Sequence, residues 1–157
     1  MAYDDLDRLL LNQLLDDGRA SLRSLADDLD VSVTTVSNRL GELEEADVIE
    51  SYEPYVNYDA LGYDITAVVQ LKLEGDAIPD VVSLLREQPR MRTVYEVTGD
   101  YDVIAVGKFR NTDEMDEQIK DLLTDTAIRE SNTSVVLNTV AEGRPFELDP
   151  DAGETVD

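Results

Sequence analysis

The chain of 157 residues is long enough for one ordinary domain or two small ones, and its 42% of hydrophobic residues can build cores. It carries 36 acidic against 13 basic residues, a formal net charge of −23, and contains neither cysteine nor histidine. Without cysteine there are no disulfides and no thiolate chemistry, and without histidine the usual general base and transition-metal ligand are missing. We therefore expect no enzyme, no cofactor and no metal site.

The location of the protein is expected to be the cytoplasm. No apolar run approaches the roughly 18 residues of a membrane-spanning helix, and the start, MAYDDLDRLL, lacks the basic region of a signal peptide. The net charge is −11 over residues 1–62, −7 over 63–140 and −5 over 141–157. Acids spread along the whole chain, with only 3 lysines among 13 bases, suit a protein kept soluble in molar salt, as in a halophile. The alternative is an ordinary acidic protein of a mesophile.

Three short helices are predicted in the first fifty residues. Residues 5–15 carry leucines near helical spacing, and DDG ends this helix at Gly18. Ser21 can cap a second helix and Ser32 a third, whose apolar positions step by three, four and three residues. These positions, expected to face inward, are Val33, Val36, Leu40 and Leu43. Two short helices joined by a tight turn, with another helix packed behind them, form a helix-turn-helix layout.

An extended segment is predicted after the third helix. Val48 and Ile49 begin it, and IESYEPYVNY follows as a wing or as a linker strand, which we place at residues 51–63. Its tyrosines, at positions 52, 55, 58 and 63, could stack on bases. Their place in the linker favours packing between subunits instead.

From residue 63 the apolar period changes from helical to alternating, which indicates strands. The strands are expected at 65–73, 93–98, 103–109 and 128–140, and the helices at 78–86 and after Asn111. The order β-α-β-β-α-β predicts a ferredoxin-like domain over 64–140, and hence an α+β fold for the chain. Both halves are small, so we expect oligomerisation. The acidic tail, 141–157, is expected to be disordered apart from Phe146, which can dock.

The sequence resembles the Lrp/AsnC family of prokaryotic transcription regulators, also called feast/famine regulators. The matching stretches are DDLDRLLLNQLLDDGRASLRSLADDLDVSVTTVSNRLGELEEADVIESY, then YEVTGDYDVI and SNTSVVL, within residues 3 to about 140. The resemblance implies an N-terminal winged helix-turn-helix over residues 1–50, a linker strand that joins a dimer, and a C-terminal effector and oligomerisation domain. Family members are typically dimers that assemble further, often into octamers, and many bind an amino acid between dimers.

Double-stranded DNA is the partner that the resemblance implies, and VSVTTVSNRL, residues 31–40, is the predicted recognition segment. Asparagine can bond an adenine edge, arginine a guanine edge, and threonine methyls can touch thymine, while a serine at the helix start can donate to phosphate. The predicted contacts are Ser32, Thr34, Thr35, Asn38 and, at the side of this face, Arg39. The alternative is that these polar residues only cap and solvate a surface helix.

Two further arginines, Arg19 and Arg23, flank the second helix, where the family geometry puts them near backbone phosphates. The alternative for them is an ion pair with Asp16, Asp17 or Asp27. The sequence departs from the family in one respect, because family recognition helices usually carry more bases than the single Arg39 here.

An amino-acid effector is implied by the loop between the second and third strands. This loop is Gly99, Asp100, Tyr101 and Asp102, and in the family it helps line a pocket between subunits, with Ser131 and Thr133 matching its other wall. A carboxylate here can hold an α-ammonium group, and backbone N–H groups can hold a carboxylate. The alternative is a polar hairpin that only orders the interface.

Together these features predict a sequence-specific DNA-binding transcriptional regulator of the Lrp/AsnC type, modulated by an amino acid or a related small metabolite. Two rival interpretations remain at this point. One is a histidine-independent enzyme of the same architecture, and the other is an oligomeric ligand-binding module that does not bind DNA.

Overall fold

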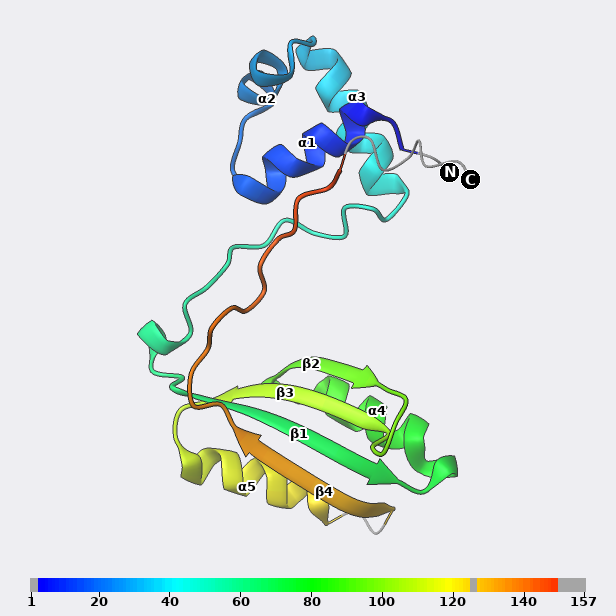
Figure 1. Cartoon of the computed structure of the whole chain (residues 1–157), viewed down its shortest axis with the longest axis vertical. Coiled ribbons are helices and arrows are strands. Elements are labelled where there is room, and N and C mark those ends of the chain that lie inside the picture. The colour runs from blue at the N-terminus through cyan, green and yellow to red at the C-terminus, as the bar shows by residue number, and fades with distance from the viewer. Residues whose placement is uncertain (1–2, 125–126, 150–157) are drawn as a thin grey trace. The chain divides into compact units, whose positions relative to one another are not determined.

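The computed structural model describes residues 3–124 and 127–149, which divide into two compact units (Figure 1). Unit 1 holds the described residues up to Tyr55 and those from Ala141 onward, while unit 2 is Val56–Val140. The chain therefore leaves unit 1 after Tyr55 and returns to it at Ala141. Residues 141–149, the described part of the C-terminal segment, therefore belong to the first unit.

Unit 1 is built on three helices. They are α1 (Asp5–Asp16), α2 (Leu22–Leu29) and α3 (Val33–Glu45). Each begins with a side chain that accepts a hydrogen bond from a backbone N–H of the first turn, and these caps are Asp4, Ser21 and Ser32. The buried core that joins the helices is Leu10, Leu25, Ala26, Val36, Leu40 and Leu43. The predicted caps at Ser21 and Ser32 are confirmed.

Two expectations, one for α3 and one for the linker that follows it, are wrong. Val33, predicted to face inward, is 44% exposed, because it lies in the first turn of α3 and at the rim of the apolar stripe. The linker strand expected at 51–63 is also absent: residues 50–57 form neither helix nor strand, and a short 3-10 helix, Asp59–Leu61, follows. A strand needs a hydrogen-bonded neighbour, and nothing in the described part of this single chain pairs with the segment.

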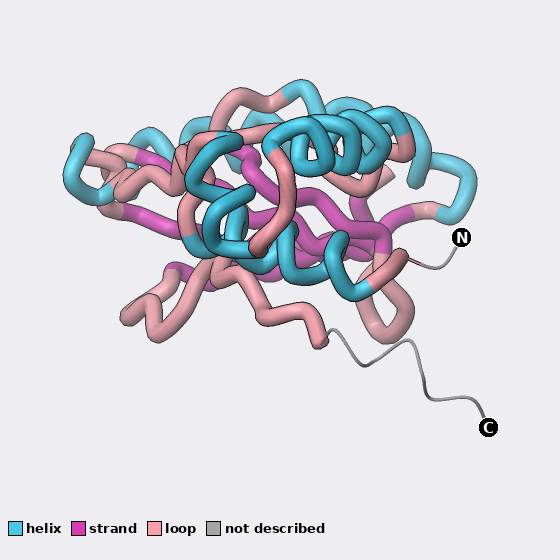
Figure 2. The backbone as a smooth tube through the Cα atoms, turned by 90° about the horizontal axis from the view of Figure 1, so that it is seen from above, coloured by secondary structure: helices cyan, strands magenta, loops and turns pink. Residues whose placement is uncertain are grey.

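Unit 2 is a sheet with two helices. Its elements are β1 (Ile65–Leu73), α4 (Ile78–Glu87), β2 (Met91–Glu96), β3 (Val103–Phe109), α5 (Thr112–Leu123) and β4 (Ile128–Val135). The strands pair antiparallel in the order β2-β3-β1-β4 (Figure 1). This sheet contains every strand of the described chain, and Figure 2 shows these strands in magenta. The ferredoxin-like order and the α+β class predicted from the sequence are confirmed.

The last strand is shorter than expected. We predicted 128–140, but β4 ends at Val135, which pairs with Ala67 near the start of β1. One further bond, from the N–H of Val136 to the carbonyl of Thr66, closes the ladder. Only Ile65 of β1 lies beyond Thr66, so this strand offers no partner to residues 138–140.

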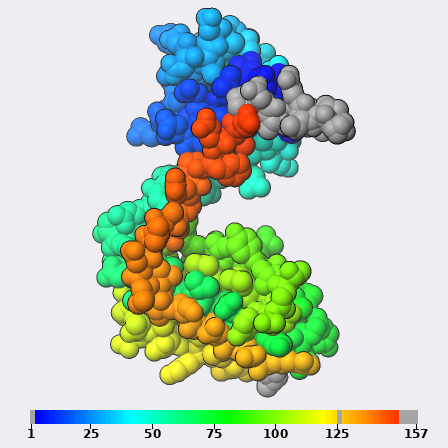
Figure 3. Space-filling model, viewed as in Figure 1, coloured from blue at the N-terminus to red at the C-terminus, as the bar shows by residue number. Residues whose placement is uncertain are grey.

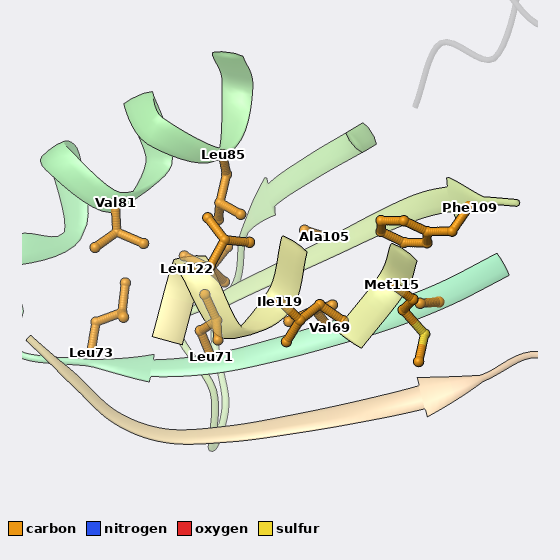
Figure 4. Close-up of a cluster of buried hydrophobic side chains, with 12 residues drawn as sticks. Val69, Leu71, Leu73, Val81, Leu85, Ala105, Phe109, Met115, Ile119 and Leu122 are labelled. Atoms are coloured by element: carbon orange, nitrogen blue, oxygen red, sulfur yellow. The ribbon is translucent and has the colours of Figure 1, made fainter. Parts of the chain in front are cut away.

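The core of unit 2 lies on one face of the sheet, under α4 and α5 (Figure 4). Val81 and Leu85 of α4 and Met115, Ile119 and Leu122 of α5 pack on the alternate residues of β1 and β3 that point to this side. The opposite face carries Val68, Ile104 and Val106, which are half-buried, and Tyr95, which is 60% exposed. No element of the described chain forms a layer over that face.

The C-terminal segment is bound to α1, contrary to the expected disorder (Figure 3). The side-chain amide of Asn12 donates to the carbonyl of Leu148 at 2.8 Å, and its oxygen accepts from the N–H of Leu148 at 2.7 Å. The side chain of Asn12 thus pairs with both backbone hydrogen-bonding groups of Leu148. Phe146, the expected docking residue, is 76% exposed, so Leu148 has that role instead. The rest of the expected disordered tail, 150–157, lies outside the described residues.

A second contact holds the start of this segment. The Tyr55 hydroxyl donates to the carbonyl of Glu142 at 2.5 Å, and Gly143 lies against the Tyr55 ring with φ at +60°. A Cβ at position 143 would stand 2.7 Å from a carbon of that ring. Glycine is therefore required here both by the close approach and by the left-handed backbone.

Candidate DNA-binding and effector sites

The outer face of α3 is free of carboxylates from its start to Gly41. Thr34 and Asn38 are exposed there, one helical turn apart, and Ser37 and Gly41 share the same face. Ser37 was missed in the sequence, although its spacing of three from Thr34 could have identified it. Around Gly41 an added Cβ would meet no atom within 4 Å, so another molecule can approach the backbone closely. The acids of α3 begin only at Glu42.

The two hydroxyls at the start of α3 form a pair. The Ser32 oxygen caps the helix by accepting the N–H of Thr35 at 3.0 Å, and it lies 2.8 Å from the hydroxyl oxygen of Thr35. Ser32 is exposed and Thr35 is half-buried. Four of the five predicted contacts on this helix are thus close neighbours around its first turns.

Arg39, the fifth predicted contact, is bound to carboxylates. Its guanidinium lies 2.8 Å from Asp4, 3.6 Å from Asp7 and 3.9 Å from Glu42, so it joins α3 to the start of α1. Burial and the nearby charge of Asp4 raise the pKa of Asp7, and the positive charge of Arg39 partly offsets this rise. The pKa of Asp4 is lowered, chiefly by the N–H that Asp7 donates to it and also by Arg39.

Arg19 and Arg23 are both exposed, on either side of the start of α2. The alternative of an ion pair with nearby aspartates is not realised, because within the described residues neither guanidinium meets a carboxylate at ion-pair distance. Only the backbone N–H of Arg19 contacts an acid, donating to Asp17 at 3.0 Å. Both side chains are therefore available to an external anion.

The segment after α3 is tied back to that helix. The Tyr52 hydroxyl donates to Glu44 at 2.8 Å. Partial burial, together with this bond and the charge of Glu44, raises the pKa of Tyr52 to about 12. The irregular segment that starts here is thereby fixed at its beginning, next to the end of α3.

In the β2–β3 hairpin, Asp102 has a structural role. Its carboxylate accepts the N–H of Leu73 at 2.8 Å, and its own N–H donates to the carbonyl of Leu71 at 2.9 Å, so it ties the hairpin to the end of β1. Gly99, with φ at +113°, makes the turn, Asp100 is exposed and Tyr101 is half-buried. Asp100 is thus the carboxylate of this loop that faces solvent.

Ser131 and Thr133 are exposed on β4, opposite Leu71 and Val69 of β1. Because β1 lies between β4 and β3, Ser131 is separated from the hairpin by two strand spacings, roughly 10 Å. One chain therefore brings the two groups of predicted effector residues to the same end of the sheet without bringing them into contact.

An ion pair at this end of the sheet was missed in the sequence. Arg129 of β4 meets Glu74 through two contacts of 2.6 Å, and the pair lowers the pKa of Glu74 and raises that of Arg129. The two residues are 55 positions apart, so only the register of the sheet shows that they meet. Across the described ranges, no group of three or more acidic side chains is arranged to hold a metal ion, and no helix is long and apolar enough to cross a bilayer.

Comparison with known proteins assigns both units. Residues 3–50 match the model of a winged helix-turn-helix DNA-binding domain, and residues 66–146 match that of the Lrp/AsnC ligand binding domain. An HTH-type transcriptional regulator of Pyrococcus horikoshii is 40% identical over 150 residues, which cover 96% of this chain and 100% of that protein.

Solved structures agree with this assignment at the level of the fold. Escherichia coli AsnC is 24% identical with a TM-score of 0.86, over 94% of this chain and 100% of its own. A transcriptional regulator of Neisseria meningitidis, crystallised with L-methionine, is 20% identical with a TM-score of 0.86, over 94% and 97% of the two chains. The resemblance seen in the sequence is confirmed: the chain belongs to the Lrp/AsnC family of helix-turn-helix transcriptional regulators.

Proposed function

We propose that this regulator reads its operator with the outer face of α3, from Ser32 to Gly41. The observation that carries the proposal is a surface of hydroxyls, an amide and a glycine, without carboxylates, in a chain of net charge −23. Thr34, Ser37 and Asn38 would contact base edges, and Ser32 with Thr35 a phosphate near the helix start. Arg19 and Arg23 would supply the charged phosphate contacts. Arg39 would reach a base only by exchanging its carboxylate partners.

The salt dependence of binding tests this mechanism. At about 1 M salt the Debye length is roughly 3 Å, against about 10 Å at 0.1 M, so remote carboxylates scarcely reach the DNA. We expect operator affinity to fall little, or even to rise, between about 0.5 and 2 M KCl. The operator would first be identified by sequencing DNA bound in the cell. A steep decline, with a log–log slope of about −0.9 for each of 6–10 phosphate contacts, would contradict the mechanism.

The residues themselves are tested by a matched pair of variants. Replacing Thr34 and Asn38 by alanine should abolish the preference for the operator over unrelated DNA, because the base-edge contacts are removed. Ser83→Ala, at an exposed position of α4, should change nothing. If the α3 variant retains full specificity, another surface reads the sequence. If the wild-type protein retards no promoter fragment in a gel-shift assay, the result favours the rival interpretation, a ligand-binding module that does not bind DNA.

We infer that the protein acts as a dimer, formed through the open face of the unit 2 sheet. Val68, Ile104, Val106 and Tyr95 give this face an apolar centre, and a second layer is the usual way to cover such a face. Light scattering in high salt should give twice the chain mass. Val106→Asp, which puts a charge in the centre of the face, should give monomers.

The effector is proposed to be an amino acid. The neighbouring Neisseria regulator was crystallised with L-methionine, and the hairpin of unit 2 offers exposed Asp100 beside turn N–H groups for an α-ammonium and an α-carboxylate. Ser131 and Thr133 would come from a second subunit, since those of the same chain lie two strands away. Possession of a ligand-binding domain is a family property, while the ligand class and these residues are the proposal.

A thermal-shift screen of the twenty amino acids tests the effector site. Asp100→Ala should abolish the shift without lowering the melting temperature of the free protein. Asp76→Ala, another exposed aspartate of unit 2, is the matched control and should keep the shift. Asp102→Ala is unsuitable, because it also leaves the Leu73 N–H without its acceptor. An undiminished shift in Asp100→Ala would exclude this residue from the site.

A further inference from the structure

Four of the 13 basic residues of the chain gather around two tyrosines in unit 2. The cations are Arg90, Arg92, Lys108 and Arg110, and the rings are Tyr58 and Tyr63; we call this group the arginine–tyrosine cluster. Arg92 lies 4.5 Å and Lys108 6.0 Å from the centre of the Tyr58 ring. Arg90 and Arg110 lie 4.8 Å and 5.5 Å from that of Tyr63. At these distances a cation is attracted to the face of a ring.

Local structure brings the two rings together. The carbonyl of Tyr58 accepts the N–H groups of Leu61 and Tyr63, and Gly62, with φ at +89°, completes the turn. The rings then meet edge to face with their centres 6.5 Å apart. The cluster thus lies where the linker enters the sheet, at the start of β1 and the end of β3.

Two of the four cations are committed to the fold. Lys108 is buried and donates to the Thr66 hydroxyl at 3.0 Å, and Arg90 forms an ion pair of 2.6 Å with Glu114. Both therefore already have partners within unit 2. Their charges still add to the local potential that an approaching anion meets.

Arg92 and Arg110 are different. In the single chain both side chains are exposed, and neither guanidinium forms an ion pair with a carboxylate of the described residues, although acids outnumber bases almost three to one. Only the backbone N–H of Arg110 meets a carboxylate, donating to Glu114 at 3.3 Å. The tyrosine rings hold the two guanidinium groups in place, and a planar, pre-oriented guanidinium matches the oxygens of a phosphate. Hydrogen bonding from Arg110 and Arg90, together with their positive charge, also lowers the pKa of the Tyr63 hydroxyl.

We propose that Arg92 and Arg110 form a second DNA-contact surface, which binds backbone phosphates of the duplex beyond the base pairs read by α3. The proposal rests on the operator binding proposed above. DNA is the polyanion that a helix-turn-helix regulator meets, and Tyr58 follows the end of unit 1 by only three residues in the sequence. Both arginines thus belong to the part of unit 2 that is tethered most directly to the operator-binding unit.

This surface is separate from the proposed effector site. Asp102 and its hairpin are bonded to Leu71 and Leu73, at the end of β1, whereas the cluster lies at its beginning. A nine-residue strand separates the two by roughly 25 Å. Flanking DNA and an effector can therefore be bound at the same time.

The test compares two duplexes, one limited to the operator and one extended by about ten base pairs on each side. The wild-type protein should bind the extended duplex more tightly. In Arg92→Gln/Arg110→Gln this gain should disappear, because the two charged phosphate contacts are removed. Affinity for the short duplex should stay unchanged. Arg86→Gln, at an exposed arginine of α4, is the control and should keep the gain.

Other outcomes overturn the proposal. If the variant melts at a lower temperature but keeps the gain from flanking DNA, the cluster only anchors the linker. If both duplexes lose affinity equally, the arginines act through the fold of the operator-binding surface. The single variants Arg92→Gln and Arg110→Gln answer the same questions should the double variant fail to fold. If the wild-type protein binds neither duplex, the proposed operator binding itself is wrong. A variant that loses affinity for the extended duplex alone leaves the operator binding intact.

Discussion

Replacing Arg39 by methionine tests what the one basic residue of α3 contributes. Its guanidinium lies 2.8 Å from Asp4 and 3.6 Å from Asp7, and the Asp7 side chain is only 8% exposed. Methionine keeps much of the apolar volume and removes the charge. The ionised Asp7 then remains buried beside Asp4 without a cation, so the folded state of unit 1 becomes less stable.

The magnitude follows from the exposure of the three side chains. An ion pair at the surface contributes about 0–1 kcal/mol, whereas breaking a buried pair costs about 3–5 kcal/mol. Arg39 and Asp4 are 35% and 48% exposed and only Asp7 is buried, so the case lies between these limits, near the lower one. We expect unfolding to require about 1–2 kcal/mol less, which for a small domain lowers the melting temperature by roughly 5–15 °C.

The loss should depend on pH with a definite sign. The pKa of Asp7 is raised in the folded protein above 3.8, so folding is favoured by its protonation and this contribution is lost as pH rises through the folded pKa. Without Arg39, which acts to lower it, the pKa of Asp7 rises further. The deficit of Arg39→Met should therefore be largest at neutral pH and shrink as the pH approaches 4.

Urea unfolding followed by circular dichroism, at several pH values between 4 and 7, is the assay. Asp7→Asn in the Arg39→Met background should restore most of the lost stability at pH 7, because no buried charge is left unpaired. A deficit that is independent of pH, or a double variant no more stable than Arg39→Met, would refute the reasoning. The folded Arg39→Met protein can also be titrated with operator DNA. If the variant no longer discriminates at one base pair of the operator, Arg39 also reads the DNA sequence.

Two further predictions concern other contacts of unit 1. Gly143→Ala puts a Cβ 2.7 Å from the Tyr55 ring at a left-handed φ, which costs about 1–2 kcal/mol of strain. The backbone amide of Leu148 should then exchange its hydrogen with solvent faster. An unchanged exchange rate would show that the contact with Tyr55 does not hold the C-terminal segment. Glu44→Gln removes the charge beside Tyr52, so the pKa of Tyr52 should fall from about 12 towards 10. Tyrosinate absorbance measures this pKa, and Tyr52→Phe assigns the signal. A constant pKa would mean that burial alone raises the pKa of Tyr52.

Local patterns in the sequence were enough to predict most elements of both units. The spacing of leucines and valines located α1, α2 and α3, and Ser21 and Ser32 marked two helix starts because capping depends on residues three positions apart. The alternation over ITAVVQLKL located β1 in the same way. The outer face of α3 was predictable for the same reason, since helical geometry alone sets which side chains share a face.

The contacts that could not be predicted join residues far apart in the chain. Asn12 holds Leu148 across 136 positions, and Arg39 pairs with acids that precede it by 32 and 35. Helical spacing singles out only Glu42, three positions after Arg39. It does not distinguish Asp4 and Asp7 from the other acids of the chain, because charge carries no information about distance. For the linker, a local pattern led to a wrong prediction. Its composition suits a strand, but a strand forms only beside a hydrogen-bonded neighbour.

The placement of the few bases reconciles DNA binding with the net charge of −23. In molar salt, charges beyond about 3 Å are screened, so a phosphate responds to the groups that touch it and hardly to the sum over the chain. Arg39 is neutralised by Asp4 and Asp7, and the first turns of α3 offer neutral donors in its place. Arg19, Arg23, Arg92 and Arg110 form no ion pair within the described residues, and we expect these four to set how much electrostatic affinity remains. We therefore expect a shallow salt slope and a gain from flanking DNA as two consequences of one charge distribution.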